Sequence, residues 1–180
     1  DGRLRPLSDF FEDGKPVVLQ LAYFRCPQLC GDVSDGAIKM MKDVGLKPGV
    51  DFEMITLSFD PDEPFQLANQ HKRQVMATVD NPRQMDAGWH FLTGKEKNIK
   101  KITEAVGFNY KWNERAQQYA HAAALIVLTP DGKVSRYLYG VRYQPQTVRL
   151  SIVEVAGRGD IGTTTDRFLM FCFQYDPDTG

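Results

Sequence analysis

Two cysteines carry the most distinctive chemistry in the sequence. Cys26 and Cys30 stand four positions apart in YFRCPQLC, directly after the apolar run KPVVLQLAYF. On a regular helix this spacing places both side chains on one face, with Cα atoms roughly 6 Å apart, near the long end of disulfide geometry. The pair can therefore form a strained, easily reduced disulfide or supply two thiolates to a metal ion. Redox pairs more commonly have a shorter spacing, which favours metal binding; two buried structural thiols are the remaining alternative.

A metal bound by two thiolates needs a further ligand, and the chain has three histidines. His71 lies among polar residues in LANQHKRQV, and we expect it to be solvated on an exposed helix face. His90 stands between Trp89 and Phe91, which predicts a packing role at a strand edge. His121 precedes an apolar strand, so we expect it on a loop at one end of a sheet. A core or hydrogen-bonded role is the alternative to metal binding there.

The surroundings of Cys26 and two further positions, Asp60 and Cys172, need an interpretation. Cys26 falls where an expected strand ends and an expected helix begins, and the backbone N–H groups and dipole of a helix N-terminus favour a thiolate. Asp60 follows the next expected strand, on the same sheet edge, where it either orients a metal ligand or a water molecule, or only forms an Asp-Pro turn into a helix. Cys172 stands in FLMFCFQY and is predicted to be a small core residue.

The hydrophobic pattern predicts the elements that position these residues. Residues 16–24 read as a strand buried on both faces, 27–44 as a helix and 52–59 as a second strand. Next we expect a helix capped by Asp62 with Pro64 in its first turn, then a short strand and turn at 88–94 and a helix at 95–107. The last expected elements are two strands in 122–140, joined at Pro130-Asp131-Gly132, and a helix at about 145–156. This order is that of an α/β, thioredoxin-like three-layer sandwich with a mixed central sheet.

Length and composition restrict the class of protein. The chain has 180 residues, with 22 Lys and Arg against 23 Asp and Glu, which gives nucleic-acid binding no electrostatic support. We expect a single domain over residues 1–180. Three cysteines are too few for a disulfide-built scaffold, and no apolar stretch approaches the roughly 20 residues that span a bilayer. We expect any signal peptide or membrane anchor to lie outside this sequence.

Four segments together resemble the SCO1/SenC family of copper proteins of cytochrome oxidase assembly. They are GKPVVLQLAYFRCPQLC, TLSFDPDEP, WHFLTG and YAHAAALIVLTPDGKV, in this order, and the resemblance runs from about residue 7 to about residue 150. It implies a thioredoxin-like domain that binds one copper ion, as Cu(I) or Cu(II), through Cys26, Cys30 and His121, with Asp60 near the site. Phe24 and Gly31 depart from the usual family residues at their positions. Residues 160–180 resemble a C-terminal extension of some bacterial members.

The resemblance implies a copper metallochaperone rather than an enzyme. It would be extracytoplasmic (periplasmic or on the outer face of the inner membrane) and membrane-anchored, and would help to load the copper-site subunit of a respiratory oxidase. Two thiolates and one imidazole form a soft, low-coordinate ligand set that suits copper and leaves a position open for an acceptor. The main alternative is a thiol–disulfide oxidoreductase whose catalytic pair, Cys26 and Cys30, reduces cysteines of the oxidase copper site or of another exported protein. A peroxiredoxin-like activity is a weaker third hypothesis.

Overall fold

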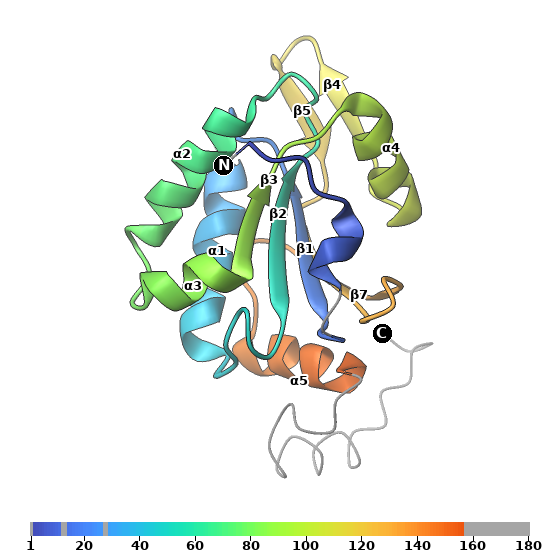
Figure 1. The fold of residues 1–180 in the computed structure, drawn as a ribbon. Helices are drawn as coiled ribbons and strands as arrows, with labels where there is room; N and C mark the ends of the chain where they lie inside the picture. Colours follow the sequence, from blue (N-terminus) through green and yellow to red (C-terminus); the bar gives the residue numbers. More distant parts are fainter. Residues whose placement is uncertain (1, 12–13, 27–28, 157–180) are drawn as a thin grey trace.

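The computed structural model describes residues 2–11, 14–26 and 29–156, without side chains at 29–33 (Figure 1). The strands are β1 (Val17–Ala22), β2 (Glu53–Ser58), β3 (Trp89–Leu92), β4 (Tyr110–Asn113), β5 (Gln118–His121), β6 (Ala124–Leu128) and β7 (Val134–Tyr139). The helices are the 3-10 turn η1 (Leu7–Phe10) and α1 (Leu29–Asp43), α2 (Phe65–Met76), α3 (Pro82–Gly88), α4 (Glu96–Ala105) and α5 (Pro145–Val155).

A mixed five-stranded sheet forms the centre of the molecule, in the order β3-β2-β1-β6-β7. Strands β1, β2 and β3 are parallel, whereas β6 pairs antiparallel with both β1 and β7. Every residue of β1 is buried, as expected for a strand covered on both faces. The expected α/β sandwich with a mixed sheet is thus confirmed.

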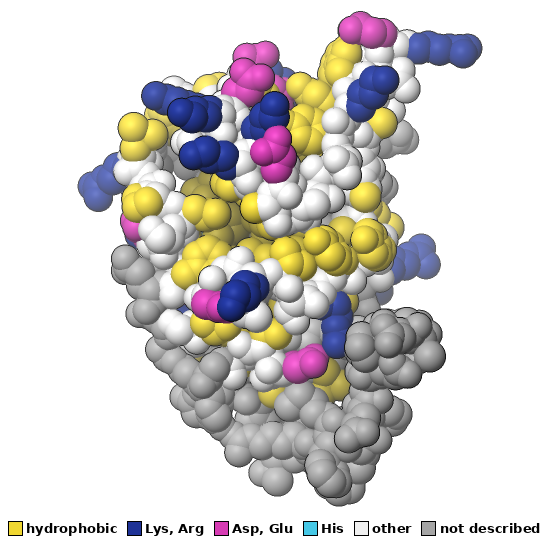
Figure 2. Space-filling model, turned by 90° about the vertical axis from the view of Figure 1, so that its right-hand side faces the viewer, with side chains coloured by type: hydrophobic (Ala, Val, Ile, Leu, Met, Phe, Trp, Pro, Cys, Tyr) yellow, Lys and Arg dark blue, Asp and Glu magenta, His cyan; other side chains and the backbone are white. Residues whose placement is uncertain are grey.

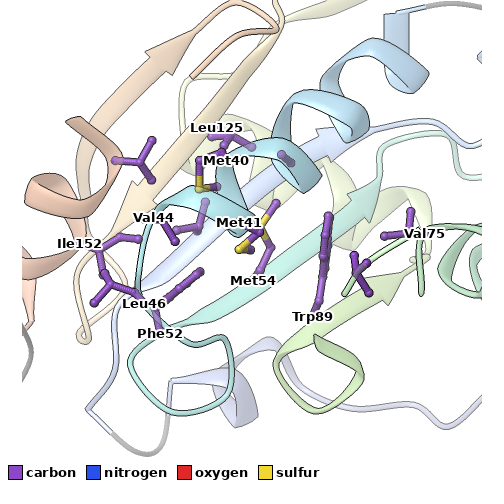
Figure 3. Close-up of a cluster of buried hydrophobic side chains, with 14 of the residues drawn as sticks. Met40, Met41, Val44, Leu46, Phe52, Met54, Val75, Trp89, Leu125 and Ile152 are labelled. Carbon is purple, nitrogen blue, oxygen red and sulfur yellow. The ribbon is translucent and has the colours of Figure 1, made fainter. Parts of the chain in front are cut away.

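Each face of the sheet has its own hydrophobic core. On one face, Met40 and Val44 of α1 and Ile152 of α5 pack against Met54 of β2 and Leu125 of β6 (Figure 3). On the other face, η1 and α4 cover alternate residues of the same strands (Figure 1). Alternate side chains along each strand point to opposite faces and so belong to two separate cores, with the sheet as the middle layer.

A chain of buried polar side chains crosses the first core. The indole N–H of Trp89 donates to Thr56 Oγ1 at 2.9 Å, and the Thr56 hydroxyl donates to Gln20 Oε1 at 3.1 Å. The Gln20 amide in turn donates to Ser34 Oγ, in α1, at 3.5 Å. Buried polar groups are costly without partners, so this chain fixes β3, β2, β1 and α1 relative to one another.

Several elements differ from the sequence expectations. Helix α3, the hairpin β4–β5 and the turn η1 were not predicted, because they are short and largely polar, with little hydrophobic period to detect. The expected cap at Asp62 is wrong. The N-cap of α2 is Pro64, and it makes no side-chain capping bond. The segment FLMFCFQY with Cys172 and the expected extension at 160–180 lie outside the described residues. In the described part, no helix is both long and apolar enough to cross a bilayer.

Gly88 should be essential where the end of α3 packs against the loop at Pro48 and Gly49. A Cβ added there would lie 1.9 Å from the backbone nitrogen of Gly49, and backbone cannot move aside cheaply. We expect Gly88→Ala to lower the free energy of unfolding by about 2 kcal/mol or more, measured by urea denaturation. Gly94→Ala is the matched control, because its Cβ would meet only the flexible side chain of Ile99, at 3.3 Å. Equal stability of the two variants would contradict this account.

Candidate functional site

The C-terminal ends of β1 and β2 bring two of the predicted site residues to one sheet edge. The two strands pair in parallel register up to Ala22 and Ser58, and the N–H of Phe59 donates to the Ala22 carbonyl at 2.8 Å. Cys26 follows β1 and Asp60 follows β2, so both lie beyond the same edge. Parallel strands at such an edge commonly carry a protein's chemistry on the loops that follow them.

Cys26 lies in a tight turn just before α1. Its backbone N–H donates to the Tyr23 carbonyl at 3.2 Å, and its half-buried side chain packs against the second core. Helix α1 begins at Leu29, three residues later, so Cys26 precedes a helix N-terminus as expected. Partial burial beside a helix N-terminus is a setting in which a thiol can be both stabilised as thiolate and reached by a reactant.

Glu63 holds the cysteine loop, and the sequence reasoning missed it. The side chain is 3% exposed, and its carboxylate accepts hydrogen bonds from the backbone N–H groups of Phe24 and Arg25, each at 2.7 Å. The same carboxylate accepts from the Ser58 hydroxyl at 2.6 Å. One buried carboxylate thus ties the loop before Cys26 to the end of β2. Its only sequence signal is its place among three carboxylates in four residues after a strand.

Asp60 forms the turn that carries Glu63. Its side chain is buried and its Oδ1 accepts from the Asp62 N–H at 3.0 Å, while its own N–H donates to Ser58 Oγ at 3.1 Å. These contacts match the expected Asp-Pro turn into a helix. A role for Asp60 in orienting a metal ligand stays a prediction.

His121 is the last residue of β5, not a loop residue as predicted, and it pairs with Tyr110 across the hairpin. Its ring packs against Phe59 at 5.0 Å between centroids and Tyr23 at 6.0 Å. Phe59 directly follows β2 and Tyr23 directly follows β1. The hairpin therefore carries His121 over the same sheet edge as Cys26 and Asp60.

The hydrogen bonding of His121 fixes which ring nitrogen is available to a ligand. Its Nδ1 lies 2.9 Å from the Ala122 carbonyl oxygen, which can only accept, so Nδ1 carries a proton. The neutral ring then has its lone pair on Nε2. This atom is buried and has no hydrogen-bond partner among the described residues. A buried acceptor whose tautomer is set by a backbone carbonyl is the arrangement typical of a metal-binding histidine.

Aromatic rings surround His121 and connect it with the acidic turn. Tyr119 packs against Tyr23 at 5.3 Å, against Phe59 at 5.4 Å and against the partly exposed Trp112 at 5.0 Å. Loss of hydration raises the pKa of Tyr119, and the nearby charge of Asp60 raises it further. Both effects keep this hydroxyl neutral. The rings that contact the imidazole of His121 are those of Tyr23, Phe59 and Phe108, and they restrict water around it. The Asp60 carboxylate lies within electrostatic reach of the neighbouring Tyr119 hydroxyl.

The predicted metal ligands are described only in part. Cys30 lies in α1, but its side chain is outside the described set. Among the residues searched, no three His, Cys, Asp or Glu side chains gather as a metal site. The Cys26–Cys30–His121 ligand set therefore stays a prediction here.

The other two histidines have structural roles. His71 was expected to be solvated, but it is partly buried against the rings of Phe24 and Phe91, at 5.2 and 5.8 Å. Burial lowers its pKa, so the neutral ring is favoured. His90 packs on Phe10 at 4.7 Å, which matches the expected packing role, and its Nε2 lies 2.8 Å from Glu53. His71 thus lies against the loop before Cys26, whereas His90 packs on the 3-10 turn η1.

Comparison with known proteins identifies the family. The SCO1/SenC family matches residues 5–156, most of the chain. This chain belongs to the SCO1/SenC family. Among curated proteins, the mitochondrial protein SCO2 homolog of Bos taurus is 24% identical over 150 residues, covering 81% of this chain and 52% of the relative. The chain thus spans about half the length of that family member.

Solved structures of the family share the fold. ScoI of Arabidopsis thaliana with copper bound matches with a TM-score of 0.60 and 18% identity, over 80% of this chain and 86% of that chain. BsSco, described as a Sco-family protein of cytochrome c oxidase assembly with a disulfide switch, matches with a TM-score of 0.59 and 16% identity, over 79% and 81% of the two chains. At these identities the likeness shows the thioredoxin-like fold alone.

Replacing the Glu63 carboxylate should loosen the cysteine loop. In Glu63→Gln, one acceptor oxygen becomes an NH2 donor facing groups that themselves donate. We expect a loss of about 1–3 kcal/mol in unfolding free energy and faster amide hydrogen exchange at Phe24 and Arg25. The control is Asp62→Asn, an exposed neighbouring carboxylate, for which both quantities should stay close to wild type. Unchanged exchange at Phe24 and Arg25 in Glu63→Gln would contradict the role of Glu63.

Proposed function

We propose that this chain is a copper metallochaperone that binds one copper ion through Cys26, Cys30 and His121 and passes it to the copper-site subunit of a respiratory oxidase. The observation that carries the proposal is the buried Nε2 of His121, which is left as a lone-pair donor by the Nδ1–Ala122 hydrogen bond beside the end of β1. Membership of the SCO1/SenC family and the copper-bound ScoI relative support it.

The donor set explains how the cargo would be held and released. Two thiolates and an imidazole are soft donors that suit Cu(I), and the nitrogen also helps to hold Cu(II). Three ligands leave a coordination position open, through which thiolates or imidazoles of an acceptor can approach. Restricted water around the imidazole would slow loss of the ion to solvent until the acceptor arrives.

Oxidation of the cysteines would act as a switch. A disulfide between Cys26 and Cys30 removes both thiolates, so the chain would bind copper only when the pair is reduced. The disulfide switch described for BsSco supports this part of the proposal. The copper-free chain with an oxidised pair would then need a thiol reductant before the next ion.

We further propose an extracytoplasmic location next to the membrane that carries the oxidase, with an anchor outside the described residues. This location follows from the proposed acceptor. An ion held by three ligands is best passed directly to the acceptor, so the chain should lie close to the copper site of the oxidase. Other copper or thiol-redox proteins are the expected sources of the ion and of reducing equivalents.

The second candidate function is that of a thiol–disulfide oxidoreductase. The half-buried Cys26, in a turn before the N-terminus of α1, favours this chemistry as much as it favours metal binding. In this case Cys26 and Cys30 would give two electrons and two protons to an acceptor disulfide and become a disulfide themselves. The chemistry does not require His121, so this residue separates the two functions.

The redox state of the cysteine pair should control copper binding. We expect reduced protein to bind one copper ion per chain and protein oxidised at Cys26 and Cys30 to bind little, measured by metal analysis after gel filtration. Cys172→Ser serves as the control, since that thiol is outside the proposed ligand set and the stoichiometry should not change. Equal copper retention by the oxidised and reduced forms would contradict copper binding by the Cys26 and Cys30 thiolates.

Replacement of His121 should separate copper delivery from thiol exchange. His121→Ala leaves two thiolates that can still hold Cu(I), but Cu(II) absorption and the loading of the oxidase in cells should fall sharply. The cysteine pair should still cycle between dithiol and disulfide. His90→Gln is the matched control, because that ring contacts Glu53 instead. Normal oxidase loading by a His121→Ala protein that no longer binds Cu(II) would favour the oxidoreductase.

A further inference from the structure

A groove of about 1100 Å³ lies away from His121, along the β3 edge of the sheet. Its walls are the N-terminal segment 3–7, helix α2 and the start of α4, and β3 lies between them. The floor is apolar and includes Phe10, Leu57 and Ile99, all buried, together with Phe91. Helix α4 is on the right of Figure 1 and therefore faces the viewer in Figure 2, which shows a hollow floored by hydrophobic side chains on this face.

The rim of the groove is strongly basic. Among the described residues that line it, the cationic side chains are Arg3, Arg5, Lys72, Arg73, Lys95 and Lys101, and the one carboxylate is that of Asp86. Arg5 pairs with Asp9 at 3.1 Å and Lys72 pairs with Asp86 at 3.0 Å, while Arg73, Lys95 and Lys101 give the rim an excess of positive charge. In Figure 2, several Lys and Arg side chains lie above the hollow, with Asp and Glu side chains among them. The rim is complementary to an acidic ligand, although the whole chain is close to neutral.

The backbone at this edge suits an extended ligand. In the described sheet, β3 has β2 on one side and no strand on the other. An edge strand presents N–H and C=O groups to which an extended peptide can add as a further strand. Leu4, at the mouth of the groove, is 91% exposed, so the rim also offers an apolar contact to such a peptide.

The groove adjoins the loop that carries Cys26. The ring of Phe91, in the floor, packs against the ring of Phe24 with 6.4 Å between centroids, and the His71 ring packs against both. Phe24 precedes Cys26 by two residues, and the Glu63 carboxylate binds its N–H. A chain lying in the groove would therefore end beside the cysteine loop.

We propose that this groove binds an extended acidic peptide segment of a partner protein and so positions the partner next to Cys26. The acidic side chains pair with the basic rim, apolar side chains at alternate positions enter the floor, and the backbone adds to β3. An anionic membrane surface shares the charge preference, but it uses neither the concave floor nor the strand edge. The partner's role in receiving copper rests on the proposed function; the binding itself does not.

Peptide binding to the whole, reduced, copper-free chain tests this site. The probe is a fluorescein-labelled peptide of about ten residues in which Glu or Asp alternates with Val or Leu. Its binding is measured by fluorescence anisotropy. We expect binding that weakens with added salt, no binding of the peptide with Lys at every acidic position, and slower amide exchange in residues 90–94 when the acidic peptide is bound.

Charge reversal locates the binding. The double variant Arg73→Glu, Lys101→Glu changes two exposed rim residues and should weaken binding about tenfold or more. The control double variant, Lys39→Glu and Arg142→Glu, makes the same change in net charge at exposed residues away from the groove and should bind almost as well as wild type. Both double variants should bind copper with unchanged stoichiometry, so a failure of the copper proposal is seen separately.

Three results would overturn the groove proposal. Equal weakening by the two double variants would mean that only net charge matters. Absence of protection in residues 90–94 would place the peptide elsewhere. Binding to vesicles of phosphatidylglycerol that depends on Arg73 and Lys101, without binding of the acidic peptide, would identify the occupant as a membrane.

Discussion

Parallel pairing of β1 with β2 is the constraint on which the rest of the site depends. Because both strands run in the same direction, their following loops leave the sheet at one edge, and Cys26 and Asp60 are brought together although they are far apart in the chain. The buried carboxylate of Glu63 then locks the two loops to each other through the backbone of Phe24 and Arg25. A shift of this register by one residue would turn every side chain of a strand to the opposite face and would dismantle the edge.

His121 reaches the same edge by a different route. It belongs to the small β4–β5 hairpin, which is a separate sheet from the central one. Its position depends on aromatic packing against Phe59 and Tyr23 rather than on a continuous hydrogen-bonded ladder. Ring packing is less directional than strand pairing, so we expect the hairpin to adjust more readily than the loops after β1 and β2. In the proposed copper protein, this is the part best able to move when the ion is taken up or passed on.

The sequence predicted the strongly patterned part of the molecule well. The apolar run 16–24 and the period of the later segments were enough for β1, α1, β2, α4, β6, β7 and α5, because a fully buried strand leaves a continuous apolar run and a half-buried element leaves a periodic one. The hairpin at His121 was missed because YKWN and QYAH are short and no residue of either strand is fully buried. Glu63 was missed and His71 was misjudged for a different reason. Glu63 binds the backbone of Phe24 and Arg25, 39 and 38 positions away, and His71 packs on Phe24 and Phe91, 47 and 20 positions away. No local pattern carries that information.

The two tryptophans of the chain occupy contrasting environments. Trp89 is fully buried and hydrogen-bonded within the core, whereas Trp112 is 39% exposed on the hairpin and stacks edge-on with Tyr119 near His121. Emission from the buried indole should therefore be blue-shifted and insensitive to iodide, and emission from the hairpin indole should be red-shifted and readily quenched. The protein thus contains two intrinsic optical reporters, one for the integrity of its core and one for events at the hairpin, which can be read in one spectrum without any label.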